Sequence, residues 1–249
     1  MKLKSFALLA LLSSWLWGDI LVYGPGGPAP VLKKLALLYN QTSQEKVIIH
    51  AGPTSSWINK AKKNADIIYS GNSSMMDSFL DLMGNKLNPS DIQVLNIREA
   101  GVIVRPTNPK KITRFSDLLK DGVKIMIVNG AGQVGLYEDM ALKYGKRSNL
   151  VDLRKNIQVI AKNSKQAIEL WEKDPSIDAL IIWRHWATVL GKDKARFIRI
   201  DKNNNIYRAS EIAITTHSRK KEEAQKFIDF LQTKEAQNIW REEGWISNY

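Results

Sequence analysis

The chain has 249 residues, of which 44% are hydrophobic, and a formal net charge of +12 at pH 7. This length is enough for one large domain or for two lobes, each with its own core. The chain contains no cysteine, which excludes disulfides, a thiolate nucleophile and a sulfur-ligated metal. The positive charge would suit a nucleic acid, an anionic surface or acidic small molecules. Because lysine and arginine are spread along the chain without a basic tail, we favour a solvated basic surface and expect no nucleic acid partner.

Residues 1–18 have the layout of a secretory signal. Lys2 and Lys4 precede a short apolar run at 6–12, and the segment ends in small and aromatic residues. That run is too short to cross a bilayer, and no later stretch is long and apolar enough to do so. An uncleaved anchor is the alternative. We therefore expect a protein exported to the periplasm whose mature chain begins at Asp19.

Short apolar runs alternate with amphipathic stretches along the rest of the chain. Such an alternation of strands and helices with short links predicts an α/β fold with a parallel sheet covered on both faces. Two helical patterns close the chain. The expected strands lie at 20–23, 46–50, 66–69, 99–104, 123–128, 157–160, 179–182, 197–200 and 210–215, and the other expected helices begin near 28 or 30, follow 52–56 and 70–74, and cover 115–119, 136–144 and 166–173.

The polar, turn-rich link at 107–111 is the candidate boundary between two α/β lobes. We expect lobe one to comprise residues 19–104 and 210–249, including the C-terminal helices, and lobe two to comprise residues 105–209. Each lobe is expected to be a mixed, mostly parallel sheet flanked by helices.

Glycine, proline and serine follow several of the expected strands. At 24–28 the sequence Gly-Pro-Gly-Gly-Pro leads into a helix, where proline fits the first turn because its missing N–H would have no partner there. The free N–H groups of a helix start, together with the helix macrodipole, favour a small anion. Similar junctions at 52–56, 70–74 and 129–135 predict that several helix starts close around one solute.

The junction from Gly130 to Gly135 matches G-x-G-x-x-G, follows an expected strand and precedes an expected helix. A dinucleotide site would also need an acidic residue after the next strand, which instead runs into Ala161-Lys162-Asn163. An exported protein also has little access to nicotinamide cofactors. We therefore favour a smaller anion at this junction over a nucleotide or a plain tight turn, and we expect no cofactor.

Catalytic arrangements are sparse in this sequence. The three histidines, His50, His185 and His217, lie in different segments and are interpreted as core or surface residues. Neither H-E-x-x-H nor G-x-S-x-G occurs, which argues against a zinc protease and a serine hydrolase. We expect no catalytic residue and no metal site, so the chain is predicted not to be an enzyme.

Charged and aromatic residues at strand ends give three further expectations. Arg184 follows the strand at 179–182, and its planar, permanently charged side chain suits a carboxylate or oxyanion. Trp57 is interpreted either as a core residue or as a lid over the site. Arg98 and Glu99 begin a strand that crosses between the lobes, and we expect them to form an ion pair in the hinge.

Several short motifs, spread over nearly the whole mature chain, occur together in this sequence. They lie at 22–28, 52–53 with Trp57, 62–67, 98–100 and 108–110. With these motifs the chain resembles type II periplasmic solute-binding proteins of the molybdate and sulfate branch, in particular the accessory colonization factor AcfC group. The resemblance implies a two-lobed fold whose interlobe cleft holds a small anion. It also implies a monomer that delivers its ligand to an inner-membrane ABC permease without covalent chemistry.

By position, the resemblance implies a ligand site built from both lobes. Its residues are Gly26, Gly27, Thr54, Ser55, Ser56, Trp57, Ser70 and Gly71 from lobe one, and Gly132, Gln133, Val134 and Arg184 from lobe two. Sulfate or a related tetrahedral oxyanion is the expected ligand. The glycines of the first loop and the arginine after Trp183 depart from the molybdate pattern, so an organic acid or amino acid is the alternative ligand. A host-interaction protein on the same fold and, last, a periplasmic hydrolase also stay open as functions.

Overall fold

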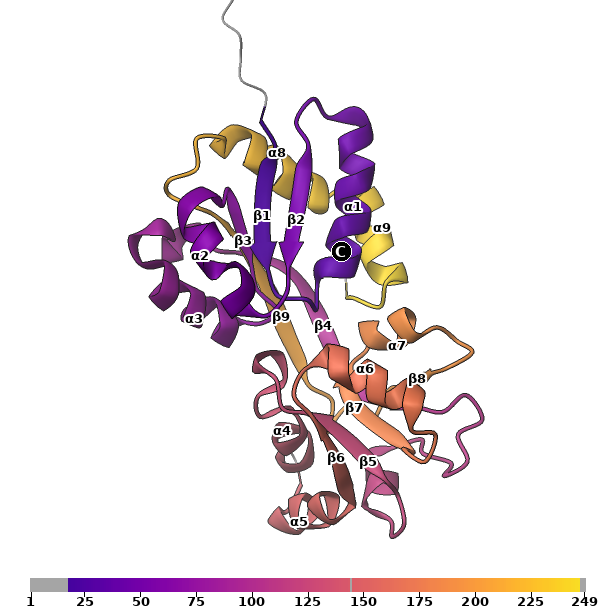
Figure 1. The fold of residues 1–249 in the computed structure, drawn as a ribbon. Coiled ribbons are helices and arrows are strands. Elements are labelled where there is room, and N and C mark those ends of the chain that lie inside the picture. Colours follow the sequence, from indigo (N-terminus) through magenta and orange to yellow (C-terminus); the bar gives the residue numbers. More distant parts are fainter. Residues whose placement is uncertain (1–17, 144, 247–249) are drawn as a thin grey trace, which may run out of the picture.

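The computed structural model describes residues 18–143 and 145–246. The expected secretory signal at 1–18 lies outside the described residues except for Gly18. Among the helices that are described, none is both long enough and apolar enough to span a membrane. The chain forms two α/β lobes that lie one above the other in Figure 1, with strands β4 and β9 running between them.

The elements follow the expected order of strands and helices, with two further helices, α5 and α7. In lobe one they are β1 (Ile20–Gly24), α1 (Ala29–Thr42), β2 (Val47–Ala51), α2 (Thr54–Asn64), β3 (Ile67–Tyr69), α3 (Ser73–Met83), the 3-10 turns Gly84–Lys86 and Pro89–Asp91, α8 (Lys221–Leu231) and α9 (Lys234–Glu242). Strands β4 (Gln93–Val104) and β9 (Tyr207–Ile214) connect the lobes. In lobe two they are the 3-10 helix Phe115–Leu119, β5 (Ile125–Val128), the 3-10 turn Ala131–Gln133, α4 (Leu136–Leu142), α5 (Arg147–Asn156), β6 (Ile157–Ala161), α6 (Ser164–Lys173), β7 (Ala179–Trp183), α7 (His185–Leu190) and β8 (Arg196–Ile198).

Local sequence accounts for the helix starts. Helix α1 begins directly after Pro28, with Pro30 in its first turn, as the sequence predicts. Helix α3 is capped by Asn72, whose side-chain oxygen accepts a hydrogen bond of 2.8 Å from the backbone N–H of Met75. Helix α5 was not expected, because its sequence is mainly polar and only a short apolar stripe faces the core.

The sheet is mixed and contains parallel parts in both lobes. Its described strands follow the order β2-β1-β3-β9-β4-β7-β5-β6, and β8 also pairs with β4. Strand β1 is parallel to β2 and β3, and β5 is parallel to β6 and β7. Strands β4 and β9 are antiparallel to their neighbours. The two strands that connect the lobes are thus antiparallel to every strand they pair with, including β8 beside β4.

Strand β4 takes part in the sheets of both lobes. Its residues 93–99 pair with β9, whereas residues 100–104 pair with β7, so the partner changes between Glu99 and Ala100. This crossing places the middle of β4 at the junction of the lobes (Figure 1). The lobe limits at 104 and 210 stay a prediction.

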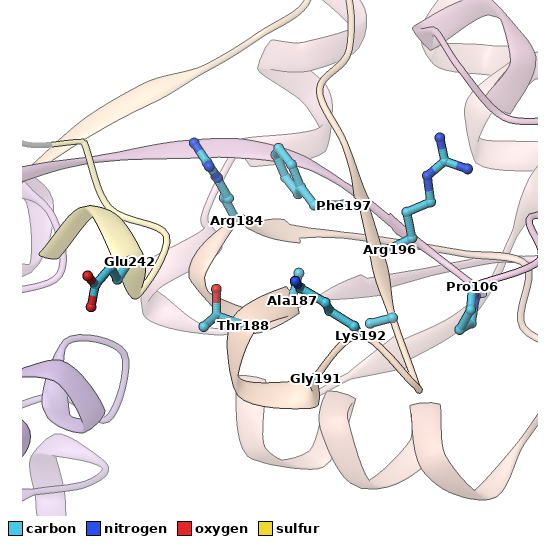
Figure 2. A pocket seen from close by; sticks show the side chains of 10 residues that line it. Pro106, Arg184, Ala187, Thr188, Gly191, Lys192, Arg196, Phe197 and Glu242 are labelled. Atoms are coloured by element: carbon cyan, nitrogen blue, oxygen red, sulfur yellow. The ribbon is translucent and has the colours of Figure 1, made fainter. Parts of the chain in front are cut away.

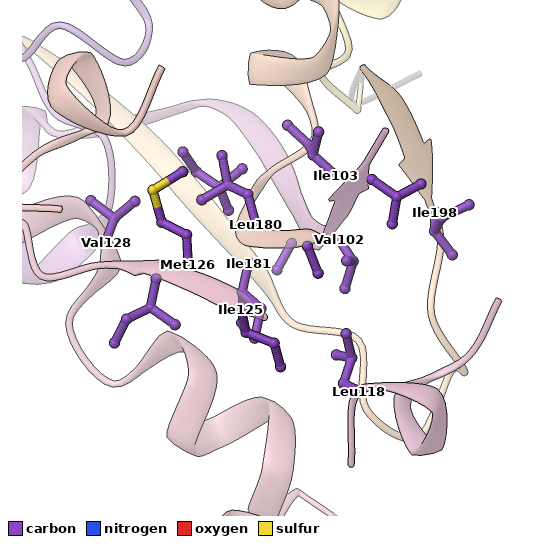
Figure 3. Packing of buried hydrophobic residues seen from close by; sticks show 14 of the residues in the cluster. Val102, Ile103, Leu118, Ile125, Met126, Val128, Leu180, Ile181 and Ile198 are labelled. Carbon is purple, nitrogen blue, oxygen red and sulfur yellow. The ribbon is translucent and has the colours of Figure 1, made fainter. Parts of the chain in front are cut away.

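Each lobe buries its own apolar residues. In lobe two, strands β5 and β7 are almost wholly buried, and their side chains pack with those of β4, as Figure 3 shows for Val102, Met126 and Leu180. Such continuous apolar strands are typical of a sheet that is covered on both faces. In lobe one, two separate clusters form on the two faces of the sheet, one under α1, α8 and α9 and the other under α2 and α3. These cores hold the helices and strands of each lobe in place, and with them the loops that join those elements.

Candidate functional site

Arg98 lies where the two lobes meet. Its side chain extends from the middle of β4, and the residue is only 2% exposed. Its Nη2 donates a hydrogen bond of 3.0 Å to the carbonyl oxygen of Gly132, and its guanidinium carbon lies 4.0 Å from the ring centroid of Trp183. Both of these partners belong to lobe two. The cation–π contact holds the plane of the guanidinium against the end of β7.

Glycines from three loops surround this guanidinium. A Cβ atom built on Gly71 would lie 3.4 Å from both terminal nitrogens of Arg98, one on Gly132 would lie 3.7 Å from them, and one on Gly27 would lie 3.9 Å from Nη1. Gly27 and Gly71 precede α1 and α3 of lobe one, whereas Gly132 follows β5 of lobe two. Because glycine has no side chain, backbone from both lobes can approach the same charged group.

The charge of Arg98 has few partners within the protein. None of the ion pairs among the described residues involves Arg98, and its Nε lies buried without a hydrogen-bond partner there. Burial, together with the positive charge of Arg208, lowers the pKa of Arg98 to about 9. A guanidinium carries five N–H donors in a planar fork, and burying such a cation without a counterion is costly. The arrangement therefore suits an anion with several oxygen acceptors.

Glu99, the next residue of β4, lies on the opposite face of the strand. Its fully buried carboxylate accepts hydrogen bonds of 2.6 and 3.0 Å from Arg199 and one of 2.7 Å from Asn205, and Nη1 of Arg184 lies 3.5 Å away. The expected ion pair between Arg98 and Glu99 is therefore wrong. Consecutive side chains of a strand point to opposite faces, so these two residues cannot face one another.

The structure brings three of the expected ligand residues together at Arg98, namely Gly27, Gly71 and Gly132. Gly26 is exposed, and a Cβ on it would meet no atom within 4 Å. Ser70 is fully buried, and its Oγ accepts a hydrogen bond of 3.3 Å from the backbone N–H of Glu211. The first and third junctions of lobe one thus meet at the guanidinium through their glycines.

The junction before α2 is organised differently. Thr54 is partly exposed and Ser55 and Ser56 are exposed, and Oγ of Ser56 donates a hydrogen bond of 2.7 Å to the carbonyl of Pro53. Trp57 is buried, its Nε1 donates to the carbonyl of Gly52 at 3.1 Å, and its ring centroid lies 5.2 Å from that of Phe79. Trp57 therefore packs in the core of lobe one, which was one of its two interpretations.

The glycine-rich junction of lobe two contains a 3-10 turn before its helix. Residues Ala131–Gln133 form this turn, and α4 begins at Leu136, as expected, directly after Gly135, whose φ is +70°. The loop points the carbonyl oxygen of Gly132 at both Arg98 and Nε1 of Trp183, the latter at 3.1 Å. Gln133 is buried and donates to Ser164, whereas Val134 is 65% exposed. Within the turn, the N–H of Gln133 already donates to the carbonyl of Gly130 at 2.8 Å.

Arg184 lies in a different part of the structure from the glycine cluster. It lines a surface pocket of about 620 Å³ together with Thr188, Phe197 and Glu242, which Figure 2 shows. Neither Arg98 nor the glycines around it line this pocket. Within the described part of the chain, no group of three or more histidine, aspartate and glutamate side chains could hold a metal ion.

Comparisons with known proteins show which family the chain belongs to. Among solved structures, the chain is similar to PEB3 with bound L-phospholactate, which is 32% identical over 92% of this chain and 100% of that chain and has a TM-score of 0.83. It is also similar to Peb3 from Campylobacter jejuni, which is 31% identical with the same coverage and has a TM-score of 0.82. The molybdate-binding protein of Azotobacter vinelandii has the same fold at 16% identity, covering 93% of this chain and 100% of that chain with a TM-score of 0.72. The comparison with curated proteins found no match. The model of the bacterial extracellular solute-binding protein family matches residues 20–246, and the chain therefore belongs to this family.

Proposed function

We propose that this chain is an exported binding protein that holds a small organic acid, in particular a phosphorylated carboxylate, between its lobes. The observation that carries the proposal is the buried guanidinium of Arg98, which has no counterion among the described residues and is surrounded by glycine backbone from both lobes. An arginine fork binds the oxygens of a carboxylate or phosphoryl group in pairs. Delivery of the solute to an inner-membrane ABC permease by a monomer is part of the proposal.

Two helix starts support an anion at the same place. Helices α1 and α3 begin within two residues of Gly27 and Gly71, and these glycines are the ones that approach Arg98. Backbone N–H groups in the first turn of a helix are unpaired, and the helix macrodipole places partial positive charge there. Together with Arg98, they can replace the hydration shell of an anion that leaves water.

The choice among anions rests on the relatives. PEB3, the relative with bound L-phospholactate, is 32% identical to this chain, and phospholactate carries both a phosphoryl and a carboxylate group. The sulfate- and molybdate-binding proteins are below 20% identical, so their likeness extends to the fold alone. A buried guanidinium also favours a strongly charged organic anion. We therefore rank a phosphorylated carboxylate ahead of the tetrahedral oxyanion that the sequence favoured.

Calorimetric titration of the chain from Asp19 onward tests this proposal. L-phospholactate should bind more tightly than L-lactate, inorganic phosphate, sulfate or molybdate, each tested separately. A ligand at 100 times its dissociation constant adds about 2.7 kcal/mol to the free energy of unfolding, so a thermal shift provides a second readout. Binding of sulfate or molybdate alone would reject the organic acid, and the absence of any response would reject anion capture.

The variant Arg98→Met tests which residue carries the binding. Removing one partner of a buried charge pair costs about 2–5 kcal/mol, so affinity should fall by about thirtyfold or more. Arg98→Lys keeps the charge but loses the planar fork, and it should recover only part of the affinity. Unchanged binding by Arg98→Met would show that the solute binds elsewhere on the protein.

A further inference from the structure

His185 lies beside the same loop as Arg98 but is not explained by the fold. It is the first residue of α7 and is 2% exposed, and neither of its ring nitrogens has a hydrogen-bond partner among the described residues. Its Nε2 lies 3.9 Å from the position that a Cβ on Gly27 would take, the same distance as Nη1 of Arg98. Imidazole and guanidinium therefore approach the first loop of lobe one together.

Packing fixes the orientation of this ring. The ring centroid of Trp245 lies 4.7 Å from that of His185 with an interplanar angle of 16°, and Trp186 lies at 5.2 Å. On the same side, a Cβ on Gly244 would come within 2.9 Å of the Cα of His185, which shows how closely the C-terminal segment packs. Stacking covers the face of the ring and leaves the nitrogens at its edge. Buried polar atoms without partners are rare and costly in proteins.

The charged group that faces His185 is Arg98, and its other neighbours are uncharged. The groups that face it are Arg98 from β4, backbone at Gly27 and Gly244, and the uncharged rings of Trp186 and Trp245. Burial, and then the positive charge of Arg98, hold the pKa of His185 well below its usual range. The imidazole is therefore neutral at pH 7. An anion bound at Arg98 would replace this repulsion with attraction.

We infer that His185 is a second binding residue of the site, whose Nε2 donates to the same anionic group as Arg98 and which takes up a proton from solvent when that group is a dianion. The inference rests on the proposed function and adds a selectivity to it. A protonated imidazole forms a charge-assisted hydrogen bond, which is about twice as strong as a neutral one. The site should thus favour a doubly charged phosphoryl group over a singly charged carboxylate.

The sign of the resulting pH dependence follows from the charges. A dianion raises the pKa of His185 in the complex above its value in the ligand-free protein, so binding between these two pKa values takes up a proton. The protein's contribution to affinity therefore rises as the pH falls through this window. A phosphoryl group itself titrates near pH 6, which acts in the opposite direction. Comparing the wild type with a variant on the same ligand removes that second effect.

The test is calorimetric titration of L-phospholactate at pH 6.5 in two buffers of different ionisation enthalpy, which gives the number of protons taken up. His185→Gln keeps an amide nitrogen near the position of Nε2 but cannot be protonated. We expect it to take up fewer protons than the wild type and to bind about tenfold more weakly, the loss of one charge-assisted hydrogen bond. His217→Gln is the matched control, because both ring nitrogens of His217 also lack partners among the described residues, and its pKa is also lowered, first by burial and then by Lys86. It should behave as the wild type.

The outcomes separate this inference from the proposed function. If the wild type binds no anion, the proposed function fails. If the wild type binds phospholactate and His185→Gln matches it in affinity and proton number, His185 only packs against Trp245 and the inference is overturned. Should the variant fold poorly, the ring protons of His185 in the wild type can be followed by NMR over pH. A pKa that rises on adding phospholactate supports the inference, and an unchanged pKa overturns it.

Discussion

Arg98 and Glu99 are neighbours on one strand, yet the protein treats their charges in opposite ways. Glu99 is fully buried and paired with Arg199, Arg184 and Asn205. Arg98 is nearly as buried, but it donates to one backbone carbonyl and has no ion-pair partner among the described residues. The pleat of β4 separates the two side chains and directs them to different faces of the strand. A charge with a complete set of partners is structural, whereas a charge without them is available to a ligand.

The same contrast extends to the residues around each charge. Around Glu99 the partners are polar side chains that reach inward from the start of β9 and from the loops after β7 and β8. Around Arg98 the nearest loops contribute glycines, which add no polar side chain, and Trp183 contributes an apolar ring face. The partners of Glu99 stabilise the crossing of the strands, whereas the surroundings of Arg98 leave N–H donors of its guanidinium without acceptors. Three experiments test this contrast between the two charges.

Glu99→Gln should lower the free energy of unfolding by about 2 kcal/mol, because a neutral amide cannot replace the charge-assisted hydrogen bonds that the buried carboxylate accepts from Arg199 and Asn205. Its solute affinity should stay within about threefold of the wild type, which is below 1 kcal/mol. Arg98→Met should do the reverse, losing affinity while its stability is unchanged or higher. Urea unfolding and calorimetric titration of the two variants measure both quantities.

Glu211→Gln provides the matched control for that experiment. Glu211 is a partly buried carboxylate on β9 that forms no ion pair within the described residues, and burial, followed by the charge of Asp77, raises its pKa. Replacing it should leave stability at pH 7 unchanged or slightly higher. If Glu99→Gln unfolds at the same urea concentration as this control, the paired charge is not structural and the comparison fails.

The stability of the ligand-free protein should depend on His185 at acidic pH. Because the pKa of His185 is lowered in the folded state, the unfolded chain binds more protons below about pH 6.5. The free energy of unfolding should therefore decrease as the pH falls, by at most about 1.4 kcal/mol per pH unit for one group. Urea unfolding between pH 7.5 and 5.5 measures this slope, which should be smaller in His185→Gln. An identical slope in both proteins would contradict the lowered pKa.

Arg184→Met should have the smallest effect. Its side chain is about one third exposed and lies 3.5 Å from a carboxylate that Arg199 already pairs, so the loss in stability should be about 0.5 kcal/mol. Its solute affinity should equal that of the wild type, as measured by calorimetry. A tenfold loss of affinity or more, about 1.4 kcal/mol, would restore Arg184 to the binding site and extend that site across the strand.

Much of the fold could be predicted because the residues that end strands and start helices act locally. Glycine and proline after β1, and Asn72 before α3, mark where strands end and helices begin, and these signals act within a few residues. Helix α5 was missed since its polar sequence forms a helix only where Leu150 and Leu153 find the core of lobe two. The antiparallel pairing of β9 could not be predicted from the sequence either, because pairing between distant strands is decided by tertiary contacts.

The site could be predicted only in part for a related reason. Gly27, Gly71 and Gly132 were expected from their junctions, but the residue they surround was assigned to an ion pair because its neighbour in sequence is acidic. The period of a strand would have separated the two, since Arg98 and Glu99 must face opposite ways. The single arginine of β4, at the point where that strand crosses between the lobes, is the signal that identifies it.

Strand β4 gives the molecule a mechanical property. Because one uninterrupted strand hydrogen-bonds to the sheets of both lobes, and β9 runs antiparallel beside it, the lobes share a paired ribbon instead of a loose tether. A ribbon resists stretching and yields to torsion, so any relative movement of the lobes must be a twist that is spread over several backbone dihedral angles. Arg98 projects from the middle of that ribbon, close to the axis of the twist. It should therefore keep its place through such a movement while the glycine loops swing around it.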